Sequence, residues 1–264
     1  MRATNINGTN LYFRFAGPAA ASTVVFVNSL GTDWRVWEPV AESLGSRHRL
    51  LFYDKRSHGL SDSTPPPSSI DDHVGDLAAL LEELEISDAI VCGLSVGGMI
   101  ALGLAAEHPL LVSAIVLADT GHRIGTTRRW NDRIERIRRD GMEAIADGVL
   151  EGWFTASFRN RRPAETALWR NMLTRTPVDG YTATCEAIRD ADLTQTARTL
   201  GIPALCLCGT EDTSTPPSLV RELSDLLPNS RYQDVPGAAH LSTVEAPRAV
   251  ARLVEDFVTE LALA

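Results

Sequence analysis

The chain of 264 residues is 44% hydrophobic and 22% charged, the composition of an ordinary globular protein that is long enough to bury a sizeable core. Its net charge of −9 argues against nucleic acid and anionic membrane surfaces as partners. No stretch approaches the roughly 18 apolar residues of a membrane span. The amino-terminal stretch has no apolar run behind a basic start, so a cytoplasmic location is expected.

The four cysteines lack the spacing of a metal site. Cys206 and Cys208 alternate along an apolar run, so both point to the same side of an expected strand. With Cys92 and Cys185, they are expected to be buried free thiols rather than metal ligands.

Short apolar runs alternate with helical patterns along much of the chain. Strands are expected at residues 11–15, 24–28, 50–54, 89–92, 113–118, 204–208 and 231–235. Helices are expected from Thr32 or Asp33 to Leu44 and at residues 70–84, 96–106, 216–227 and 246–261. The alternation predicts an α/β fold with a mostly parallel central sheet and helices on both of its faces.

Residues 121–199 interrupt this alternation with one helical pattern after another and no convincing strand. The segment is too long for an ordinary connection. We therefore expect a core formed by residues 1–120 and 200–264, with residues 121–199 inserted as a helical cap. Such a cap is expected to lie over the carboxyl ends of the strands, where open α/β sheets bind ligands.

A glycine-flanked serine follows the expected strand at residues 89–92. In Gly93-Leu94-Ser95-Val96-Gly97, the two glycines remove side chains that would collide at a sharp strand-to-helix turn. Such a turn exposes Ser95 as a nucleophile. It also presents the N–H of Val96 at a helix N-terminus, where developing negative charge is stabilised. The alternative is a buried structural serine.

A serine nucleophile needs a general base, and the base needs an acid that orients it. His240 follows the last expected strand, and Asp212 lies in the loop after the strand at residues 204–208. Both are therefore expected at the same edge of the sheet as Ser95. The chain order serine, aspartate, histidine is that of α/β-hydrolases. Glu211 is the rival acid.

A second oxyanion donor is expected in the loop after residues 24–28, where the backbone N–H of Leu30 is the candidate. The alternative is an ordinary strand-to-helix turn. Among the histidines, His58 is expected to hold a turn and His122 to line the pocket at the start of the cap. His48 and His73 are expected at the surface.

These residues together resemble the α/β-hydrolase superfamily over essentially the whole chain, and more closely the 3-oxoadipate enol-lactonases. The closer resemblance is carried by residues 28–33, 93–99, 130–131, 133–134, 148–151, 153–155, 180–181 and 187–190. The matches in the expected cap are the most informative, because esterases, dehalogenases and haloperoxidase-like members share the core motifs. By this resemblance, Ser95, Asp212 and His240 correspond to the catalytic triad, and Leu30 and Val96 to the oxyanion donors.

Two positions depart from the superfamily pattern. Asn28-Ser29 stands where members usually have His-Gly, although enol-lactonases are similar to this chain there. Ser57 stands where many members have glycine, in an Arg-Gly-His-Gly turn. The second departure concerns the geometry of that turn and not the triad.

The resemblance implies the hydrolysis of 3-oxoadipate enol-lactone to 3-oxoadipate in the β-ketoadipate pathway of aromatic-acid degradation. It implies an acyl-enzyme on Ser95, no metal or organic cofactor, and a small-molecule lactone as the partner. The carboxylate of this substrate needs a cation or a hydrogen-bond donor in the pocket. Arg133 and Trp130 are the candidates, Trp130 through its indole N–H, although Trp130 also suits the core of the cap.

Other functions remain open at this point. A general carboxylesterase or a cofactor-free, haloperoxidase-like perhydrolase would use the same triad, so only the cap residues favour the lactone. A haloalkane dehalogenase is disfavoured because it needs a carboxylate nucleophile where Ser95 stands. A ligand receptor on this fold can keep an intact triad with slow turnover, and a turnover assay separates it from an enzyme.

Overall fold

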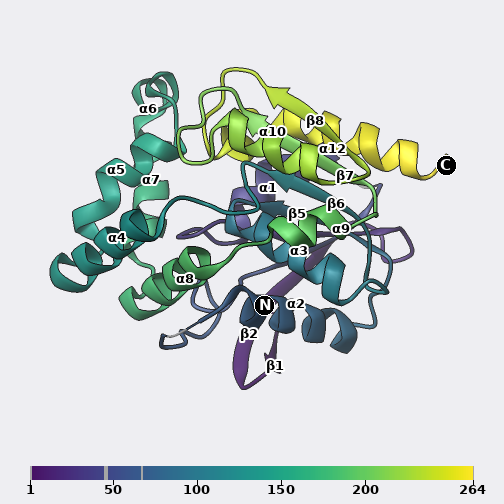
Figure 1. The fold of residues 1–264 in the computed structure, drawn as a ribbon, viewed down its shortest axis with the longest axis horizontal. Helices are drawn as coiled ribbons and strands as arrows, with labels where there is room; N and C mark the ends of the chain where they lie inside the picture. Colours follow the sequence, from purple (N-terminus) through teal and green to yellow (C-terminus); the bar gives the residue numbers. More distant parts are fainter. Residues whose placement is uncertain (1, 45–46, 67, 264) are drawn as a thin grey trace.

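The computed structural model describes residues 2–44, 47–66 and 68–263, which form an eight-stranded sheet between two layers of helices (Figure 1). The strands are β1 (Arg2–Ile6), β2 (Thr9–Ala16), β3 (Thr23–Val27), β4 (Arg49–Tyr53), β5 (Ala89–Leu94), β6 (Val112–Ala118), β7 (Ala204–Gly209) and β8 (Ser230–Val235). The helices outside the segment between β6 and β7 are η1 (Trp34–Trp37), α1 (Glu38–Leu44), α2 (Ile70–Glu83), α3 (Val96–Glu107), α10 (Pro217–Leu226), α11 (Ser242–Glu245) and α12 (Pro247–Leu261).

The sheet has the strand order β1-β2-β4-β3-β5-β6-β7-β8. Strand β2 runs antiparallel to both β1 and β4, and the remaining neighbours pair in parallel. Strands β3, β5 and β7 are buried along their whole length, as is typical of parallel strands covered on both faces. The predicted α/β fold with a mostly parallel sheet is confirmed.

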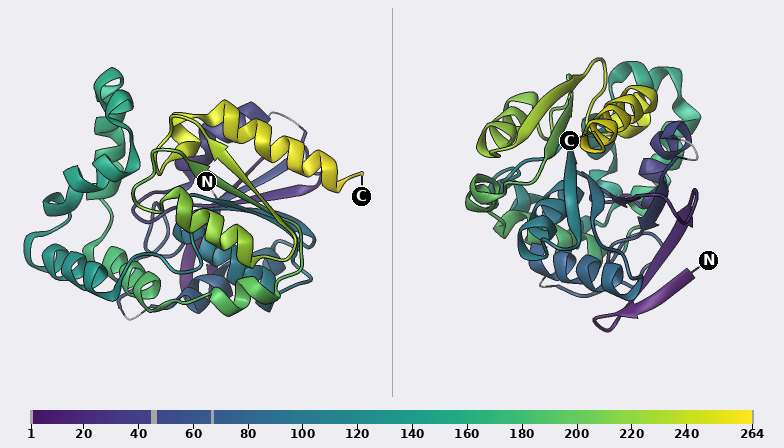
Figure 2. Two further views of the ribbon diagram at one scale, coloured as in Figure 1. Left: turned by 45° about the horizontal axis from the view of Figure 1, so that its top comes forward. Right: turned by 90° about the vertical axis from the view of Figure 1, so that its right-hand side faces the viewer.

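Helices cover the two faces of the sheet in separate groups (Figure 2). Helix α2 packs on α3, which contacts β5 and β6, and α10 contacts β7 and β8. On the other face, α1, α11 and α12 contact one another. None of the helices in the described part of the chain combines the length and the apolar character needed to span a membrane.

Three elements differ from the sequence-based expectation, one of them the short helix α11, which was not expected. Strand β1 was not expected, because only Ile6 of its residues is buried and the others give little apolar alternation. The expected helix at residues 33–44 consists of the 3₁₀ turn η1 followed by α1. Asp33 caps η1 by accepting a hydrogen bond from the Arg35 N–H at 3.0 Å. Pro39 has no N–H to continue a single helix through this point, which explains the break.

His48 and His73 are buried, so the expectation that both lie at the surface is wrong. His48 Nε2 hydrogen-bonds Glu255 on α12 at 3.1 Å. His73 lies on the buried face of α2. The amphipathic pattern of α2 makes this position part of its inner face, and the polarity of histidine hides that fact in the sequence.

The segment between β6 and β7 is helical. Its helices are α4 (Thr127–Asp140), α5 (Glu143–Trp153), α6 (Ala156–Arg161), α7 (Pro163–Thr174), α8 (Val178–Asp190) and α9 (Thr194–Thr199). Helix α9 contacts α3 and α10 beside the sheet. Helices α4 to α8, which we call the cap helices, stand together at one end of the sheet (Figures 1 and 2).

Candidate active site

Ser95 lies at the sharp turn between β5 and α3. Its backbone has φ 58° and ψ −120°, a conformation that side-chain-bearing residues rarely adopt. A Cβ atom at Gly93 would lie 2.1 Å from the carbonyl oxygen of Gly97, and one at Gly97 would lie 2.3 Å from that of Val27. The two glycines therefore make the turn possible, and the packing around them holds Ser95 in its strained conformation.

Ser95 and His240 both line a cavity of about 270 Å³ between the carboxyl ends of the strands and the cap helices. Among the described residues, none forms a hydrogen bond with the Ser95 hydroxyl. That hydroxyl is thus available to a molecule in the cavity, and His240 shares the cavity with it. A base near a hydroxyl nucleophile is the arrangement that serine hydrolases use.

His240 is paired with Asp212. The distance between His240 Nδ1 and Asp212 Oδ2 is 2.8 Å, and both side chains are buried. The Thr215 hydroxyl donates to the same carboxylate oxygen at 2.6 Å, and the N–H groups of Ser214 and Thr215 donate to Oδ1. Glu211, the rival acid, is exposed. The geometry selects Asp212 as the partner of His240.

The charges of Asp212 and His240 shift the pKa values of both groups. Burial lowers the pKa of His240, but the charge of Asp212 and its hydrogen bond outweigh burial, so the pKa lies above its ordinary value of 6.5. Burial also opposes ionisation of Asp212, but the charge of His240 and the hydrogen bonds to the carboxylate hold its pKa below the usual range. Asp212 is therefore an ionised acceptor that stabilises a positive charge on the imidazole.

The loop after β3 carries Leu30, which lines the cavity together with Ser29. Lys55 Nζ donates to the Ser29 carbonyl at 2.6 Å, and His58 Nε2 accepts from the Gly31 N–H at 2.9 Å. Burial lowers the pKa of His58 well below its usual value, so its ring is neutral and able to accept this bond. His58 thus has a structural contact, as expected, and the contact fixes this loop.

Two backbone donors are free near Ser95. Val96 is the first residue of α3, and Leu30 lies in the loop after β3. Within the described part of the chain, neither N–H donates to a protein acceptor. Unpaired N–H groups at a helix N-terminus and in a fixed loop can bind the oxygen of a tetrahedral intermediate.

The cap helices contribute the remaining wall of the cavity. Both predicted contacts, Trp130 and Arg133, line it, and the Arg133 guanidinium lies 5.1 Å from the centre of the Trp130 ring. The Trp130 indole N–H, however, donates to the Ile124 carbonyl at 2.7 Å. The expectation that this N–H serves a ligand is therefore wrong, because the turn before α4 uses it. Trp130 offers the cavity its ring alone.

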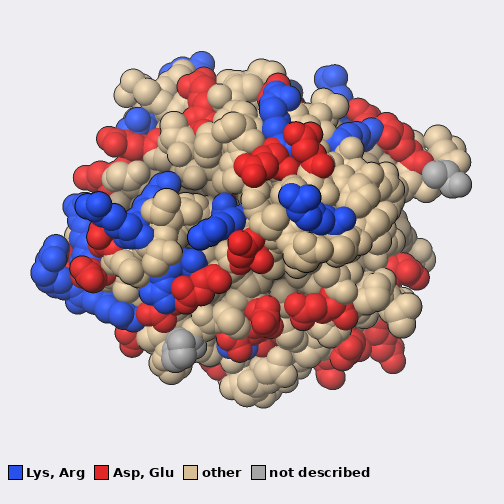
Figure 3. Space-filling model, viewed as in Figure 1, with Lys and Arg blue, Asp and Glu red and all other residues tan. Residues whose placement is uncertain are grey.

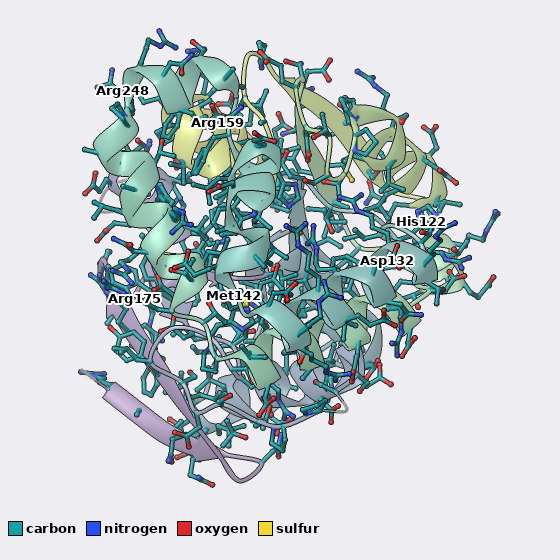
Figure 4. The ribbon with its side chains drawn as sticks, turned by 90° about the vertical axis from the view of Figure 1, so that its left-hand side faces the viewer. His122, Asp132, Met142, Arg159, Arg175 and Arg248 are labelled. Carbon is teal, nitrogen blue, oxygen red and sulfur yellow. The ribbon has the colours of Figure 1, made fainter. Side chains whose placement is uncertain are left out.

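The prediction that His122 lines the pocket is also wrong. Its side chain is buried outside the cavity, and Nε2 lies 3.7 Å from a Glu222 carboxylate oxygen on α10. Figure 4 shows His122 near one edge of the cap side of the molecule, across from Arg175. The chain after β6 carries His122 toward α10 before it turns into α4, a path that the sequence does not reveal.

Three residues that sequence reasoning did not single out belong to the site. Arg129 lines the cavity beside Arg133, and Thr215 lines it beside His240. Asp119 is buried directly after β6. Asp212 was located in the sequence by its position after a buried strand, and the same rule would have located Asp119. No such signal separates Arg129 from the other arginines of α4.

The cap is fixed to the loop that carries His240. The Leu241 N–H donates to the Trp153 carbonyl at the end of α5, at 2.9 Å. Glu245 accepts from the Ala239 N–H at 2.6 Å and from the Thr155 hydroxyl at 2.8 Å. These bonds hold residues 153–155 against the histidine loop, so this end of the cap cannot move without disturbing His240.

One group of potential metal ligands occurs among the described residues. Oxygen atoms of Asp119 and Asp212 and the sulfur of Cys208 lie within 4.8 Å of one another. All of the carboxylate oxygens already accept hydrogen bonds. Burial raises the pKa of the Cys208 thiol far above its usual value, which disfavours the thiolate that a metal needs. These donors do not fit a metal site. All four cysteines are buried and free, as predicted.

Comparison with known proteins shows to which family this chain belongs. A model of the alpha/beta hydrolase family matches residues 24–253. The chain belongs to this family. The α/β hydrolase is 31% identical over 239 residues to 3-oxoadipate enol-lactonase 2 of Acinetobacter baylyi, an alignment that covers 90% of this chain and 89% of that relative.

Solved structures agree with the family assignment. The enol-lactonase from Burkholderia xenovorans superimposes with a TM-score of 0.95 and 38% identity, covering 98% of this chain and all of that one. A hydrolase from Pseudomonas aeruginosa superimposes with a TM-score of 0.93 and 30% identity, covering 97% of both chains. The resemblance to enol-lactonases is confirmed, and the chain is a hydrolase of the α/β family.

Proposed function

We propose that this α/β hydrolase opens 3-oxoadipate enol-lactone, a five-membered enol-lactone with a carboxymethyl side chain, to 3-oxoadipate in the β-ketoadipate pathway. The observation that carries the proposal is the pair Arg129 and Arg133 in the wall of the cavity that also holds Ser95 and His240. Among the described residues, neither arginine has a carboxylate partner. A substrate with both a reactive carbonyl and a free carboxylate matches this cavity.

The arginines suit an anion of this size. Partial burial and the adjacent Arg133 lower the pKa of Arg129, although the charge of Asp212 opposes the shift, so two like charges lie close together here. A bound carboxylate relieves this repulsion and gains charge-assisted hydrogen bonds. The Trp130 ring provides an apolar face beside Arg133 for the lactone ring.

In the first step, the Ser95 oxygen attacks the lactone carbonyl carbon while His240 Nε2 takes the serine proton. Asp212 stabilises the resulting imidazolium. The N–H groups of Leu30 and Val96 hold the oxyanion, and each such donor contributes roughly 3 kcal/mol to transition-state stabilisation. The carbonyl carbon to ring oxygen bond then breaks, the leaving oxygen takes the proton from His240, and the enol becomes a ketone.

In the second step, a water molecule loses a proton to His240 and attacks the acyl-enzyme on Ser95. Collapse of the second tetrahedral intermediate returns the proton from His240 to Ser95 and releases a carboxylic acid, which then loses its own proton to water. An enolate is a better leaving group than an alkoxide or an amine, so protonation of the leaving group is less demanding here than in amide hydrolysis.

Steady-state kinetics of two variants on the same helix tests the substrate assignment. We expect Arg133→Gln to lower kcat/KM for 3-oxoadipate enol-lactone about 10- to 100-fold, since a charge-assisted hydrogen bond is lost. Its effect on p-nitrophenyl acetate, which has no carboxylate, is expected to stay within about threefold because only ring packing changes. Arg136→Gln is the matched control, because Arg136 is exposed and lies outside this cavity.

Equal losses on both substrates would contradict the role of Arg133 as the carboxylate contact. Brisk cleavage of p-nitrophenyl acetate with slow turnover of the lactone would favour a general carboxylesterase of this family. Peroxide-dependent perhydrolysis that exceeds both hydrolytic rates would favour the haloperoxidase-like function.

A further inference from the structure

Asp119 is the first residue after β6, and its side chain is completely buried. Its backbone has φ 46°, in the left-handed region that also holds Ser95. A side-chain-bearing residue keeps such a conformation only when its surroundings enforce it, and such residues cluster at functional sites. Asp119 has no role in the proposed catalytic mechanism.

The Asp119 carboxyl group joins the two loops that carry the catalytic pair. Its Oδ1 accepts from the N–H of Gly209 at 2.8 Å, and Gly209 ends the strand that leads to Asp212. Its Oδ2 is hydrogen-bonded to the hydroxyl of Ser242, which begins α11 two residues after His240. One side chain from β6 therefore spans the loop of the acid and the turn that follows the base.

Asp119 also lies close to the charges of the pair. Its carboxylate oxygen lies within 4.8 Å of an oxygen of Asp212 and of the Cys208 sulfur. Burial and the charge of Asp212 raise the pKa of Asp119 to about 8, although His240 and the two hydrogen bonds oppose the shift. Two carboxylates so close together in a buried site do not both ionise readily, and Asp212 is the one held in its charged form.

We propose that Asp119 is a positioning residue whose carboxyl group ties the loop carrying Asp212 to the turn that follows His240. The proposal rests on the catalytic role of the Asp212–His240 pair but not on the identity of the lactone. Asp119 is not among the residues that line the cavity, so it acts through the geometry of the pair. Below about pH 8 it adds no second negative charge beside Asp212.

Two substitutions at this position separate the hydrogen bonds from the charge. Asp119→Asn keeps an acceptor for the Gly209 N–H and a polar group for Ser242, and asparagine tolerates a positive φ. Asp119→Gly removes the side chain without backbone strain, since glycine accepts this φ freely. Both variants are assayed with p-nitrophenyl acetate for kcat, KM and pH profile, and the His240 Nδ1 proton is followed by NMR.

We expect Asp119→Gly to lower kcat about 10- to 100-fold, as small misplacements of catalytic groups do, with KM changed less than about threefold. Its His240 Nδ1 proton resonance is expected to shift upfield or broaden as the bond to Asp212 loosens. Asp119→Asn is expected to recover most of the lost kcat. The wild-type profile is expected to decline near pH 8 as Asp119 ionises beside Asp212, His240 and Cys208, and Asp119→Asn is expected to lack this decline.

An unchanged kcat and resonance in Asp119→Gly would overturn the proposal, as would Asp119→Asn losing as much kcat as Asp119→Gly. If Asp119→Gly does not fold, Ser242→Ala cuts one of the two links, and an unaltered His240 resonance in that variant would likewise overturn it. Ser95→Ala, assayed in parallel, separates the two failures. Full activity in Ser95→Ala would refute the proposed mechanism. The role of Asp119 would still be decided by whether the His240 Nδ1 resonance changes in the Asp119 variants.

Discussion

The protonation state of His240 decides whether Ser95 can lose its proton. A general base must be neutral, and the pKa of His240 is raised above 6.5 because the charge and hydrogen bond of Asp212 outweigh burial. A raised pKa keeps the imidazole protonated to a higher pH. We therefore expect kcat/KM to fall toward acid with a midpoint above pH 6.5, measured with p-nitrophenyl acetate, which does not itself titrate. A midpoint below 6.5 would show that burial, and not Asp212, controls this histidine.

Individual residues of the site differ in how far the sequence locates them. Ser95 and Asp212 each follow a buried strand, and His240 follows the parallel strand β8, which is mostly not buried. The fold rule alone predicts that the three residues meet, and the structure brings them to one edge. No such rule predicts where the side chains of Trp130 and His122 lie. Whether an indole N–H or an imidazole faces a cavity depends on the path of residues 119–126, which tertiary packing decides.

At the scale of the elements, cap helix α8 fits against the core at one closely packed point. A Cβ atom on Gly180 of α8 would lie 2.3 Å from the Cβ of Ser57. Ser57 itself has φ 67°, where most residues other than glycine are strained. The serine therefore explains why α8 needs a glycine opposite it.

A double-mutant cycle measures this contact. We expect Gly180→Ala to lower the free energy of unfolding by about 1–3 kcal/mol, because it overpacks a tight interface. Ser57→Gly, introduced into the same chain, removes the opposing Cβ and is expected to restore much of the loss. Gly148→Ala, also in a cap helix but with open space around its Cβ, is the control and is expected to change stability little. Additive effects at Ser57 and Gly180 in denaturant unfolding would contradict the packing explanation.

Most elements follow from apolar periodicity, and the exceptions have local causes. The expected strands at residues 24–28, 50–54, 113–118 and 231–235 correspond to β3, β4, β6 and β8 within a residue or two at each end. Strand β1 is an exposed edge strand stabilised by its pairing with β2, a contact that its own residues do not signal. The division of residues 34–44 into η1 and α1 depends on Pro39, which a periodicity argument overlooks.

For the whole molecule, charge is distributed unevenly. The chain carries a net charge of −9, yet arginines gather on the cap helices, on the left of the face drawn in Figure 3. Many are paired, for example Arg138 with Glu186 and Arg170 with Glu143, whereas Arg129 and Arg133 face the cavity. Glu151 also lines this cavity, but the two arginines give its wall an excess of positive charge, which favours an anionic ligand.

This distribution predicts a salt effect that depends on the substrate. We expect kcat/KM for the anionic lactone to fall about threefold or more as ionic strength rises from about 0.01 to 0.3 M, because salt screens attraction to the arginines. The value for neutral p-nitrophenyl acetate is expected to change little. An equal response of both substrates would indicate a general effect of salt on the enzyme and not electrostatic attraction by the cap.

The most direct test of the proposed function is steady-state hydrolysis of freshly generated 3-oxoadipate enol-lactone, beside p-nitrophenyl acetate, by the wild-type protein and by Ser95→Ala. We predict a kcat/KM for the lactone that exceeds the value for the ester by at least about 100-fold, as expected where binding of the remote carboxylate stabilises the transition state. Both activities are expected to fall by at least about 1,000-fold in Ser95→Ala. Lactone turnover that is slower than ester cleavage, or that survives the loss of Ser95, would contradict the account.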